Sequence, residues 1–507
     1  MWKNSKTAIL KSDLSRFKLS FELKTKPMKY TLPMICFMLM SLMTIAQKQK
    51  LNPNKTGIIQ SVDKHQKELI DLSDKVWSYA ETALKEYKSA KVLADYAEAQ
   101  GFVVKRGVAG MPTAFTAEFG SGKPVIGIMG EYDALPGISQ KAQPTKEAYE
   151  AGGAGHGCGH NLFGAGSLGA AVAVKELIQQ GKLKGIVRFY GTPAEESVGG
   201  KIYMAREGLF NDLDVCLDWH PDTEIAASTQ SSQAMVDFIV EFKGKAAHAA
   251  GDPWNGRSAV DGLESFTDGV NMLREHVRPS VRMHYAIVNG GDVPNVVPEY
   301  AKIWMWVRDS KRSVVEEVFG RVKEIARGAA IIAGVESKVT VTSGDYELLV
   351  NRTGAGALQK NLEILGPITY TPEEIAFAKK IQEVSGSEQT GLDGKIHELK
   401  PTAEHPTGGS TDVGDISWIV PEITLVATTA PANTAWHAWQ VVACGGMSIG
   451  HKGLVLASKS LGMTMVDLFE NEQLRKDIRT EFDQRKGGHV YKAYIPDGPP
   501  PIPSMKQ

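Results

Sequence analysis

The sequence has few cysteines, almost no net charge and no long apolar run in its interior, and each shortage excludes a class of protein. Only four cysteines occur in 507 residues, and their spacing forms no disulfide framework. The formal net charge is −1 without any long run of lysine or arginine, so nothing supports nucleic-acid binding. No mid-chain segment has the length of a membrane-spanning helix. The hydrophobic content of 42% indicates an ordinary globular protein, and its length predicts two domains.

An apolar stretch near the N-terminus, residues 28–46, has the pattern of a secretory signal peptide. A lysine precedes a short, largely apolar run, and small residues stand at the positions that a signal peptidase reads before Gln47. We therefore expect cleavage near Ala46 and export to the periplasm or the extracellular space, with no membrane span in the mature chain. A buried helix or a short anchor is the alternative. Residues 1–27 resemble no domain, so we expect translation to start at Met28.

The rest of the chain alternates between two patterns of secondary structure. Up to residue 231, apolar strands such as 124–131 and 184–192 are followed by loops and by helices such as 167–180. Strand, loop and helix in succession predict a parallel α/β sheet, whose chemistry collects at the carboxyl ends of the strands. Residues 232–350 instead read strand, helix, strand, strand, helix, strand, which is the ferredoxin-like unit.

The predicted domain organisation is one catalytic domain interrupted by a smaller one. We expect the catalytic domain to comprise residues 47–231 and 351–490, with the ferredoxin-like lid or dimerisation domain of residues 232–350 inserted between them. A proline-rich tail, residues 491–507, closes the chain and is expected to run along the surface or to be loose.

The segment "GHGCGHN", residues 155–161, places Cys158 between two histidines and separates them with glycines. Sulfur and imidazole suit a metal such as zinc, and a thiolate beside an imidazole also suits nucleophilic catalysis. Other strand ends supply the adjacent carboxylates Glu195 and Glu196, and two more histidines, His220 and His437. A thiol protease would have no use for the paired glutamates, so a metal site is the better interpretation.

Seven segments in order resemble one family of enzymes. They are "GHGCGHN", "GTPAEESVGGK", "DWHP", "GKAAHAAGDPWNGRSAVDGLE", "GGDVPNVVPEYA", "GSTDVGDISW" and "HAWQVVACG". The chain resembles the amidohydrolase branch of the binuclear aminoacylase/carboxypeptidase metallopeptidase family, and within it one of the subunit types of p-aminobenzoyl-glutamate hydrolase. The resemblance runs from about residue 64 to residue 469. It implies an α/β catalytic domain with a mixed central sheet flanked by helices, plus the inserted lid.

The resemblance also implies a role for each matching residue. It makes Glu195 the general base and His248 the donor to the oxyanion, contributed from the dimer partner in relatives. Asp133 would orient a ligand from behind, while Asn295 and Arg308 would hold the substrate carboxylate; an ion pair with Asp309 is the plainer alternative for Arg308. The implied metal ligands are Cys158, His160, Glu196, His220 and His437.

Three further positions keep open roles at this stage. Glu131 lies where other branches hold a histidine ligand, and Asn161 stands where this branch usually has aspartate. Asp412 and its neighbour Asp415 are expected either to cap the following helix or to line the pocket.

The predicted function is the metal-dependent hydrolysis of an amide bond in an N-acyl amino acid such as p-aminobenzoyl-glutamate. Two divalent ions, manganese or zinc, would be the cofactors. A homodimer is expected, and whether it also needs a related subunit stays open. The alternatives are a secreted dipeptidase or carboxypeptidase with the same site, a non-catalytic binding protein derived from the family, and a thiol hydrolase that uses Cys158.

Overall fold

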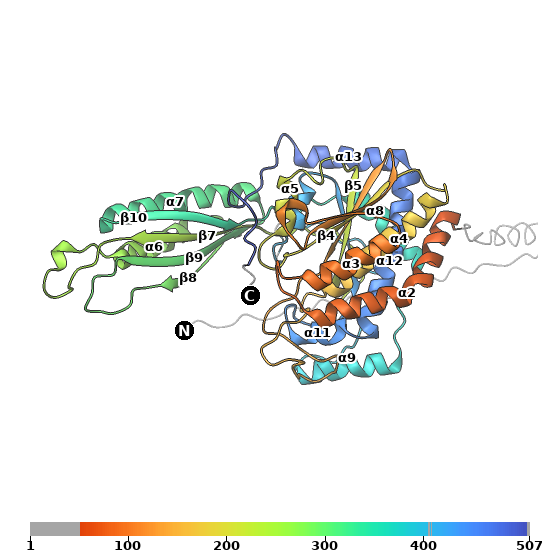
Figure 1. The fold of residues 1–507 in the computed structure, drawn as a ribbon, viewed down its shortest axis with the longest axis horizontal. Coiled ribbons are helices and arrows are strands. Elements are labelled where there is room, and N and C mark those ends of the chain that lie inside the picture. Colours follow the sequence, from red (N-terminus) through yellow and green to blue (C-terminus); the bar gives the residue numbers. More distant parts are fainter. Residues whose placement is uncertain (1–50, 404–405, 407, 504–507) are drawn as a thin grey trace, which may run out of the picture. The chain divides into compact units, whose positions relative to one another are not determined.

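The structure is a computed structural model that describes residues 51–403, 406 and 408–503, so the predicted signal at 28–46 lies outside the described residues. Its larger part is built on a seven-stranded sheet with the order β1-β2-β4-β3-β5-β11-β6 (Figure 1). The strands are β1 (Val103–Arg106), β2 (Phe115–Ser121), β3 (Val125–Glu131), β4 (Gly185–Thr192), β5 (Val215–Asp222), β6 (Ala226–Ala227) and β11 (Glu422–Thr428).

The sheet is mixed, as the resemblance implied. Strands β4, β3, β5 and β11 pair in parallel and form its centre, whereas β1, β2 and β6 add antiparallel pairs at the two edges. All seven residues of β3 are buried, which explains its continuous apolar sequence. Because the central strands run in one direction, their carboxyl ends lie along one edge of the sheet, where ligands collect in such folds.

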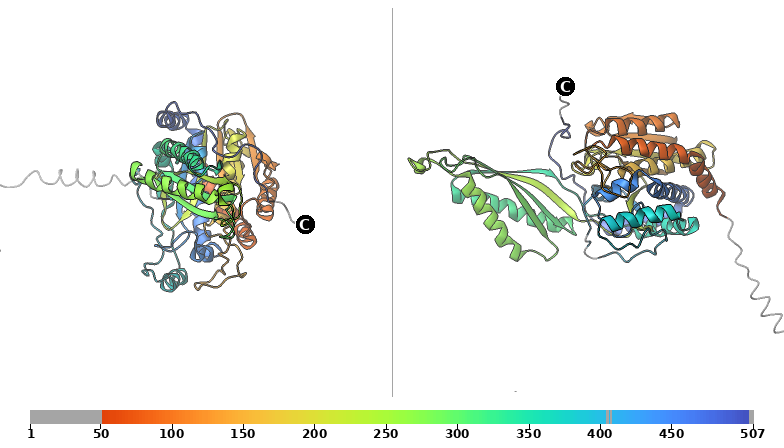
Figure 2. Two further views of the ribbon diagram at one scale, coloured as in Figure 1. Left: turned by 90° about the vertical axis from the view of Figure 1, so that its left-hand side faces the viewer. Right: turned by 90° about the horizontal axis from the view of Figure 1, so that it is seen from below.

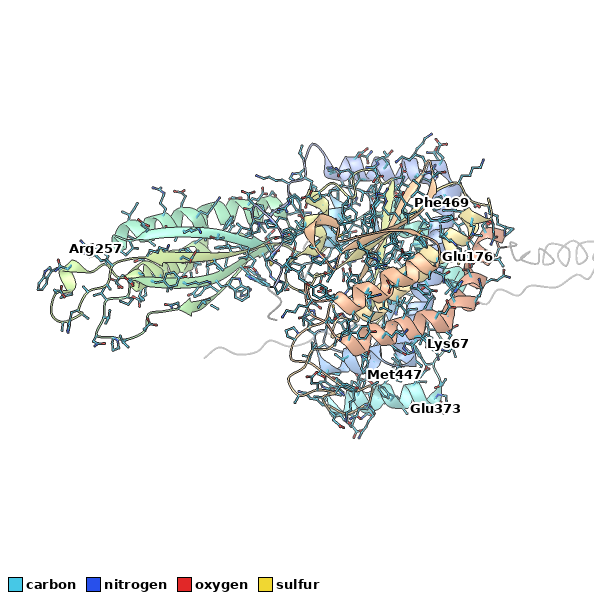
Figure 3. The ribbon with its side chains drawn as sticks, viewed as in Figure 1. Lys67, Glu176, Arg257, Glu373, Met447 and Phe469 are labelled. Carbon is cyan, nitrogen blue, oxygen red and sulfur yellow. The ribbon has the colours of Figure 1, made fainter. Side chains whose placement is uncertain are left out.

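Helices pack on the sheet and on one another. Helix α4 (His160–Gln179) packs against β3, and it also contacts α2 (Pro53–Tyr79) and α12 (Ser448–Glu470), which contact each other. A small residue is needed where α4 approaches β5, because a methyl group at Gly166 would lie 3.0 Å from the Trp219 ring. At the surface, Glu176 on α4 joins the two helices by accepting a hydrogen bond from Lys64 of α2 at 3.0 Å (Figure 3).

The remaining helices of this part lie around the sheet and near its loops. They are α3 (Tyr87–Ala99), α5 (Gly200–Arg206), α8 (Arg352–Leu365), α9 (Pro372–Val384), α10 (Val413–Ser417), α11 (Trp439–Gly445) and α13 (Glu472–Lys486), with the 3-10 turn η1 (Val108–Gly110). Among the described residues no single helix is long and apolar enough to cross a membrane. Helices α11 and α12 reach that length and composition only together, with a bend of 71° between them.

The second sheet has four antiparallel strands in the order β10-β7-β9-β8. Its strands are β7 (Ala234–Lys243), β8 (Arg282–Asn289), β9 (Tyr300–Asp309) and β10 (Glu336–Ser343), and its helices are α6 (Ala259–Leu273) and α7 (Arg312–Ala333). Both helices cover the same face (Figure 2) and bury a core with residues such as Phe238 and Phe319. The predicted strand and helix order, and with it the ferredoxin-like fold, is confirmed.

The described part of the C-terminal tail contacts the larger part of the structure. The Arg206 side chain donates hydrogen bonds to the backbone carbonyls of Pro496 and Gly498, at 3.2 and 2.8 Å. The Tyr491 hydroxyl donates to the Asp415 carboxylate at 2.8 Å. The three described cysteines, Cys158, Cys216 and Cys444, are buried and free, so disulfides play no part in this region.

Candidate metal centre

The carboxyl ends of the parallel strands bring the predicted ligands together. Glu131 ends β3, the Glu195–Glu196 pair follows β4, and His220 lies near the end of β5. Cys158 and His160 stand at the first turn of α4, which follows the loop after β3. The turn between them needs glycine, because Gly159 has φ 78° and a methyl group there would lie 2.8 Å from Pro221. Residues far apart in sequence thus converge at one edge.

Two groups of side chains have the spacing of metal sites and share one sulfur. In each group the possible ligand atoms all lie within 4.8 Å of one another. The first group is Cys158, His160 and His220, and the second is Cys158, Glu196 and His437. The Cys158 sulfur is 3.3 Å from His220 Nε2, and His437 Nε2 is 3.3 Å from Glu196 Oε2. Because Cys158 belongs to both groups, its thiolate would be able to contact two neighbouring ions.

Contacts behind the ligands orient the histidines. His160 Nδ1 lies 2.9 Å from Asp133 Oδ1, and the other Asp133 oxygen accepts the Glu196 backbone N–H at 2.9 Å. His220 Nδ1 donates to the Pro221 carbonyl at 2.7 Å. With Nδ1 engaged in this way, each ring presents Nε2 to the centre as the free ligand atom. Asp133 thus contacts the His160 ring on the side opposite its Nε2 atom.

Several buried polar atoms at the centre have no hydrogen-bond partner among the described residues. They include His160 Nε2, Glu131 Oε2 and Glu196 Oε1. His160 Nε2 and Glu131 Oε2 lie 2.9 Å apart as an ion pair, without the geometry of a hydrogen bond. Buried polar atoms are normally hydrogen-bonded, so a bound group at this place would supply the partner that Glu196 Oε1 lacks among the described residues. The nitrogen, sulfur and oxygen donors of this cluster fit divalent metal ions.

Burial and charge perturb the titration of the centre. Burial raises the pKa of Glu195 well above its ordinary value, and the neighbouring carboxylates Glu131 and Glu196 add to this rise. Burial also raises the pKa of Glu196, to about 7. Burial raises the pKa of the Cys158 thiol, so without a metal this sulfur stays protonated at neutral pH. Coordination by Cys158 therefore has to release a proton.

The loop that carries Glu195 is held in a strained conformation by a residue that sequence reasoning missed. Ala194 has φ 62°, a left-handed value that costs energy for any residue with a side chain. Its backbone N–H donates to the buried Glu86 carboxylate at 3.0 Å. Burial raises the pKa of Glu86 to about 8, with a further rise from Asp133. Glu86 lies far from the recognised motifs, so no local signal marks it.

Glu131 pairs with a buried lysine that the sequence interpretation also missed. Lys201 Nζ lies 2.6 Å from Glu131 Oε1 and 2.7 Å from Asp412 Oδ1. Burial alone would lower the pKa of Lys201, but these two carboxylates raise it instead. Asp412 does not cap its own helix α10 with its side chain; it accepts the backbone N–H of Lys201 at 2.9 Å. Asp415 accepts hydrogen bonds from Tyr346 and Tyr491, so neither aspartate acts as the predicted cap.

Three polar or aromatic residues near the centre have structural contacts instead. Asn161 Nδ2 donates to Ser73 Oγ at 3.1 Å and to the Gly445 carbonyl at 3.0 Å, so it joins α4 to two other helices. The His156 ring lies 3.0 Å from the Val76 carbonyl, outside both groups of possible ligands. Trp219 is fully buried and donates to the Phe163 carbonyl, so it packs in the core and leaves no face for a substrate.

The predicted lid residues fall at opposite ends of the small sheet. His248 and Asn295 are exposed and adjacent, because the Ala249 backbone N–H donates to the Asn295 carbonyl at 3.0 Å. His248 Nδ1 accepts two backbone N–H groups, which leaves Nε2 as its donor. Arg308 lies at the other end of β9, where it stacks on the Trp306 ring at 4.6 Å from the centroid instead of pairing with Asp309.

Comparisons with known proteins agree with this architecture. Residues 127–386 match peptidase family M20/M25/M40. A p-aminobenzoyl-glutamate hydrolase subunit of Escherichia coli is 38% identical over 88% of this chain and 98% of its own. The human Xaa-Arg dipeptidase is 29% identical over 86% of this chain and 93% of its own. A dinuclear metal-binding M20 peptidase from Bacillus subtilis shares the fold, with a TM-score of 0.55 and 18% identity, over 80% of this chain and 99% of its own. The chain therefore belongs to peptidase family M20/M25/M40.

Proposed function

We propose that the protein hydrolyses the amide bond of an N-acyl amino acid of the p-aminobenzoyl-glutamate kind, with two divalent metal ions as cofactors. The observation that carries the proposal is the Cys158 sulfur, which belongs to both groups of possible ligands. Its support from relatives is the identity of 38% to the p-aminobenzoyl-glutamate hydrolase subunit of Escherichia coli, across nearly the whole of both chains. The buried atoms His160 Nε2 and Glu196 Oε1, which make no hydrogen bond among the described residues, fit the same cofactor.

In this proposal each ligand has a defined place. His160 and His220 would hold one ion, Glu196 and His437 would hold the other, and Cys158 would contribute to both. When bound, such a pair of ions supplies an activated water and polarises the scissile carbonyl. Zinc suits the cysteine and histidine donors, and manganese suits the carboxylates, so we propose either metal. Asp133 fixes His160 in the tautomer that keeps Nε2 free.

Glu195 is the proposed general base. It follows Ala194 in the strained loop and lies with Glu131 and His160 in a cluster whose polar atoms are within 4.8 Å of one another. Its carboxylate accepts the proton of the attacking water and returns it to the leaving amine. The strained, fixed backbone keeps the carboxylate in place while Glu196, its neighbour, points to the ligands.

The substrate and the lid are proposed to meet through a second copy of the chain. Arg308 pairs with Met235 near the start of β7, whereas His248 follows Lys243 at the other end of this strand. The eight residue steps from Met235 to Lys243 span about 26 Å. One substrate cannot contact both residues of the same chain across such a distance. We propose that residues 232–350 form the lid and dimerisation domain, and that His248 and Asn295 act at the site of the partner in a homodimer. A related chain is a further proposed partner, because this sequence matches two different p-aminobenzoyl-glutamate hydrolase subunits of Escherichia coli.

A dipeptidase is the second candidate, since the Xaa-Arg dipeptidase is 29% identical over most of both chains. Such an enzyme would use the same ligands and differ in the pocket that receives the acyl side. We also propose that residues 28–46 direct export and are removed near Ala46.

The test is hydrolysis by the chain that starts at Gln47, after a chelator has removed metal and manganese or zinc has been returned. We expect activity on p-aminobenzoyl-glutamate to return with metal in the wild type and to fall roughly 10²–10⁴-fold in Glu195→Gln. Glu207→Gln, an exposed glutamate on the same segment, is the matched control. Activity on dipeptides alone would favour the second candidate. Turnover that persists in the chelator, or the absence of bound metal, would refute the proposal.

A further inference from the structure

A fully buried cation lies beside the metal centre without belonging to it. The Lys201 side chain has no exposed surface, and its two partners, Glu131 and Asp412, are exposed by 2% and 1%. Burying one ammonium and two carboxylates costs several kcal/mol per ion, which only close pairing offsets. Neither the ligand set nor the general base uses Lys201. A buried ammonium at this place therefore calls for a role that a packed apolar side chain could not perform.

Glu131 is the partner that makes this position important. Its second oxygen, Oε2, lies 2.9 Å from His160 Nε2, the atom that faces the centre. Glu131, His160 and Glu195 form a third group whose possible ligand atoms lie within 4.8 Å of one another. A carboxylate at this place is chemically able to bind the ion at His160. A hydrolytic metal site, however, needs open positions for water and substrate.

We propose that Lys201 is a positioning residue that ties Glu131 to Asp412 and so keeps this carboxylate out of the metal coordination shell. The 2.6 Å contact occupies Glu131 Oε1 with a cation that cannot itself bind a metal while it is protonated. Asp412 holds the lysine at both ends, since it accepts the backbone N–H and the ammonium of the same residue. The inference rests on the proposed function, because it requires bound metal.

The same chain of contacts also fixes the loop of the general base. Lys201 lies in the first turn of α5, directly after the loop that carries Glu195 and Glu196. Asp412 reaches it from a segment 211 residues further along the chain. Removing the cation would release Glu131 on one side and loosen the start of α5 on the other.

Cobalt binding to the purified chain from Gln47 tests the inference without a substrate. Cobalt(II) absorbs visible light more weakly as its coordination number rises. We expect the wild type and Glu131→Gln to bind two cobalt ions with the same visible spectrum, because Glu131 is not a ligand. In Lys201→Met we expect weaker absorption as Glu131 joins the shell, and in Lys201→Met/Glu131→Gln a return to the wild-type spectrum. Turnover of Lys201→Met should fall roughly 10–100-fold and recover in part in the double variant.

The matched control is Lys55→Met, which removes another buried lysine far from the centre. Lys55 pairs with Asp467 at 2.7 Å, so its loss should lower stability and leave the cobalt spectrum unchanged. An altered spectrum or the loss of one ion in Glu131→Gln would overturn the inference, and this isosteric variant gives an answer even if Lys201→Met does not fold. An unchanged spectrum in folded Lys201→Met would overturn it as well. A wild type that binds no cobalt would refute the proposed function instead.

Discussion

Replacing Asn161 by aspartate, the residue usual at this position in the family branch, should destabilise this protein. Asn161 is fully buried and uses both amide hydrogens, one to Ser73 Oγ and one to the Gly445 carbonyl. A carboxylate can recover the first contact, because the serine hydroxyl can rotate and donate to it. It cannot recover the second, and leaving a buried carbonyl without a donor costs about 1–3 kcal/mol. Burial of the new charge adds to this cost, so N161D should lower the free energy of unfolding by roughly 2–4 kcal/mol at pH 8.

The assay is urea unfolding of the metal-free protein. Metal is removed first because an ion bound at the neighbouring His160 would itself contribute to the free energy of unfolding. Burial raises the pKa of the new carboxyl in the folded state, so the folded protein holds a proton that the unfolded chain releases. The loss should therefore shrink as the pH falls toward 5, where a protonated carboxyl can donate to Gly445. The control is Asn471→Asp, an exposed cap whose oxygen accepts the Leu474 N–H and which aspartate replaces well. A loss of equal size in the control, or none in N161D, would refute the reasoning.

Three other predictions concern a buried carboxyl, the metal and the lid. Burial, reinforced by Asp412, raises the pKa of Asp345 to about 7, so the free energy of unfolding should fall as the pH rises from 4 to 7. Urea unfolding across this range should show a weaker dependence of the free energy of unfolding on pH in Asp345→Asn than in the wild type. The difference in this dependence should amount to roughly 2–4 kcal/mol above pH 7, and parallel curves for the two proteins would contradict this. Chelation should lower the melting temperature, with a loss of about 2.7 kcal/mol if metal was present at a hundredfold excess over its Kd; an unchanged melting curve would argue against resident metal. Arg308→Lys should raise KM about tenfold with little change in kcat in steady-state kinetics, because lysine lacks the forked donor for a carboxylate; an unchanged KM would show that Arg308 only packs on Trp306.

The sequence predicts those parts of the site that depend on short segments of the chain. Glycines around Cys158 and His160, and polar residues at the ends of apolar strands, indicate the possible ligands, because the carboxyl ends of parallel strands share one edge. The order of strands and helices likewise predicts the ferredoxin-like unit. The antiparallel edge made by β1 and β2 is not predicted, since the short, mostly exposed β1 lacks a clear apolar alternation.

Contacts across long sequence separations could not be predicted. Lys201 meets Glu131 from 70 residues away and Asp412 from 211, and no spacing rule relates these positions. Asp412 shows the consequence most clearly. Its position before a helix predicts a cap, but the tertiary structure offers the carboxylate a buried ammonium and a backbone N–H, and this charged pairing is stronger than a cap at its own helix.

The contacts at the base of the lid explain why Arg308 and His248 should affect different kinetic constants. Met235 and Asp345 exchange backbone hydrogen bonds of 3.0 Å beside Arg308, and the buried Arg312 guanidinium donates to the Met235 carbonyl at 2.8 Å. Arg308 thus lies next to the fixed end of this domain, so a substrate carboxylate bound by Arg308, as proposed, would be held without any movement of the domain. His248 lies at the exposed far end, where a small rotation about this base produces a large displacement. We therefore expect His248→Ala to lower kcat with little change in KM, the opposite of Arg308→Lys. A rise in KM alone for His248→Ala would show that this histidine binds substrate and does not stabilise the oxyanion.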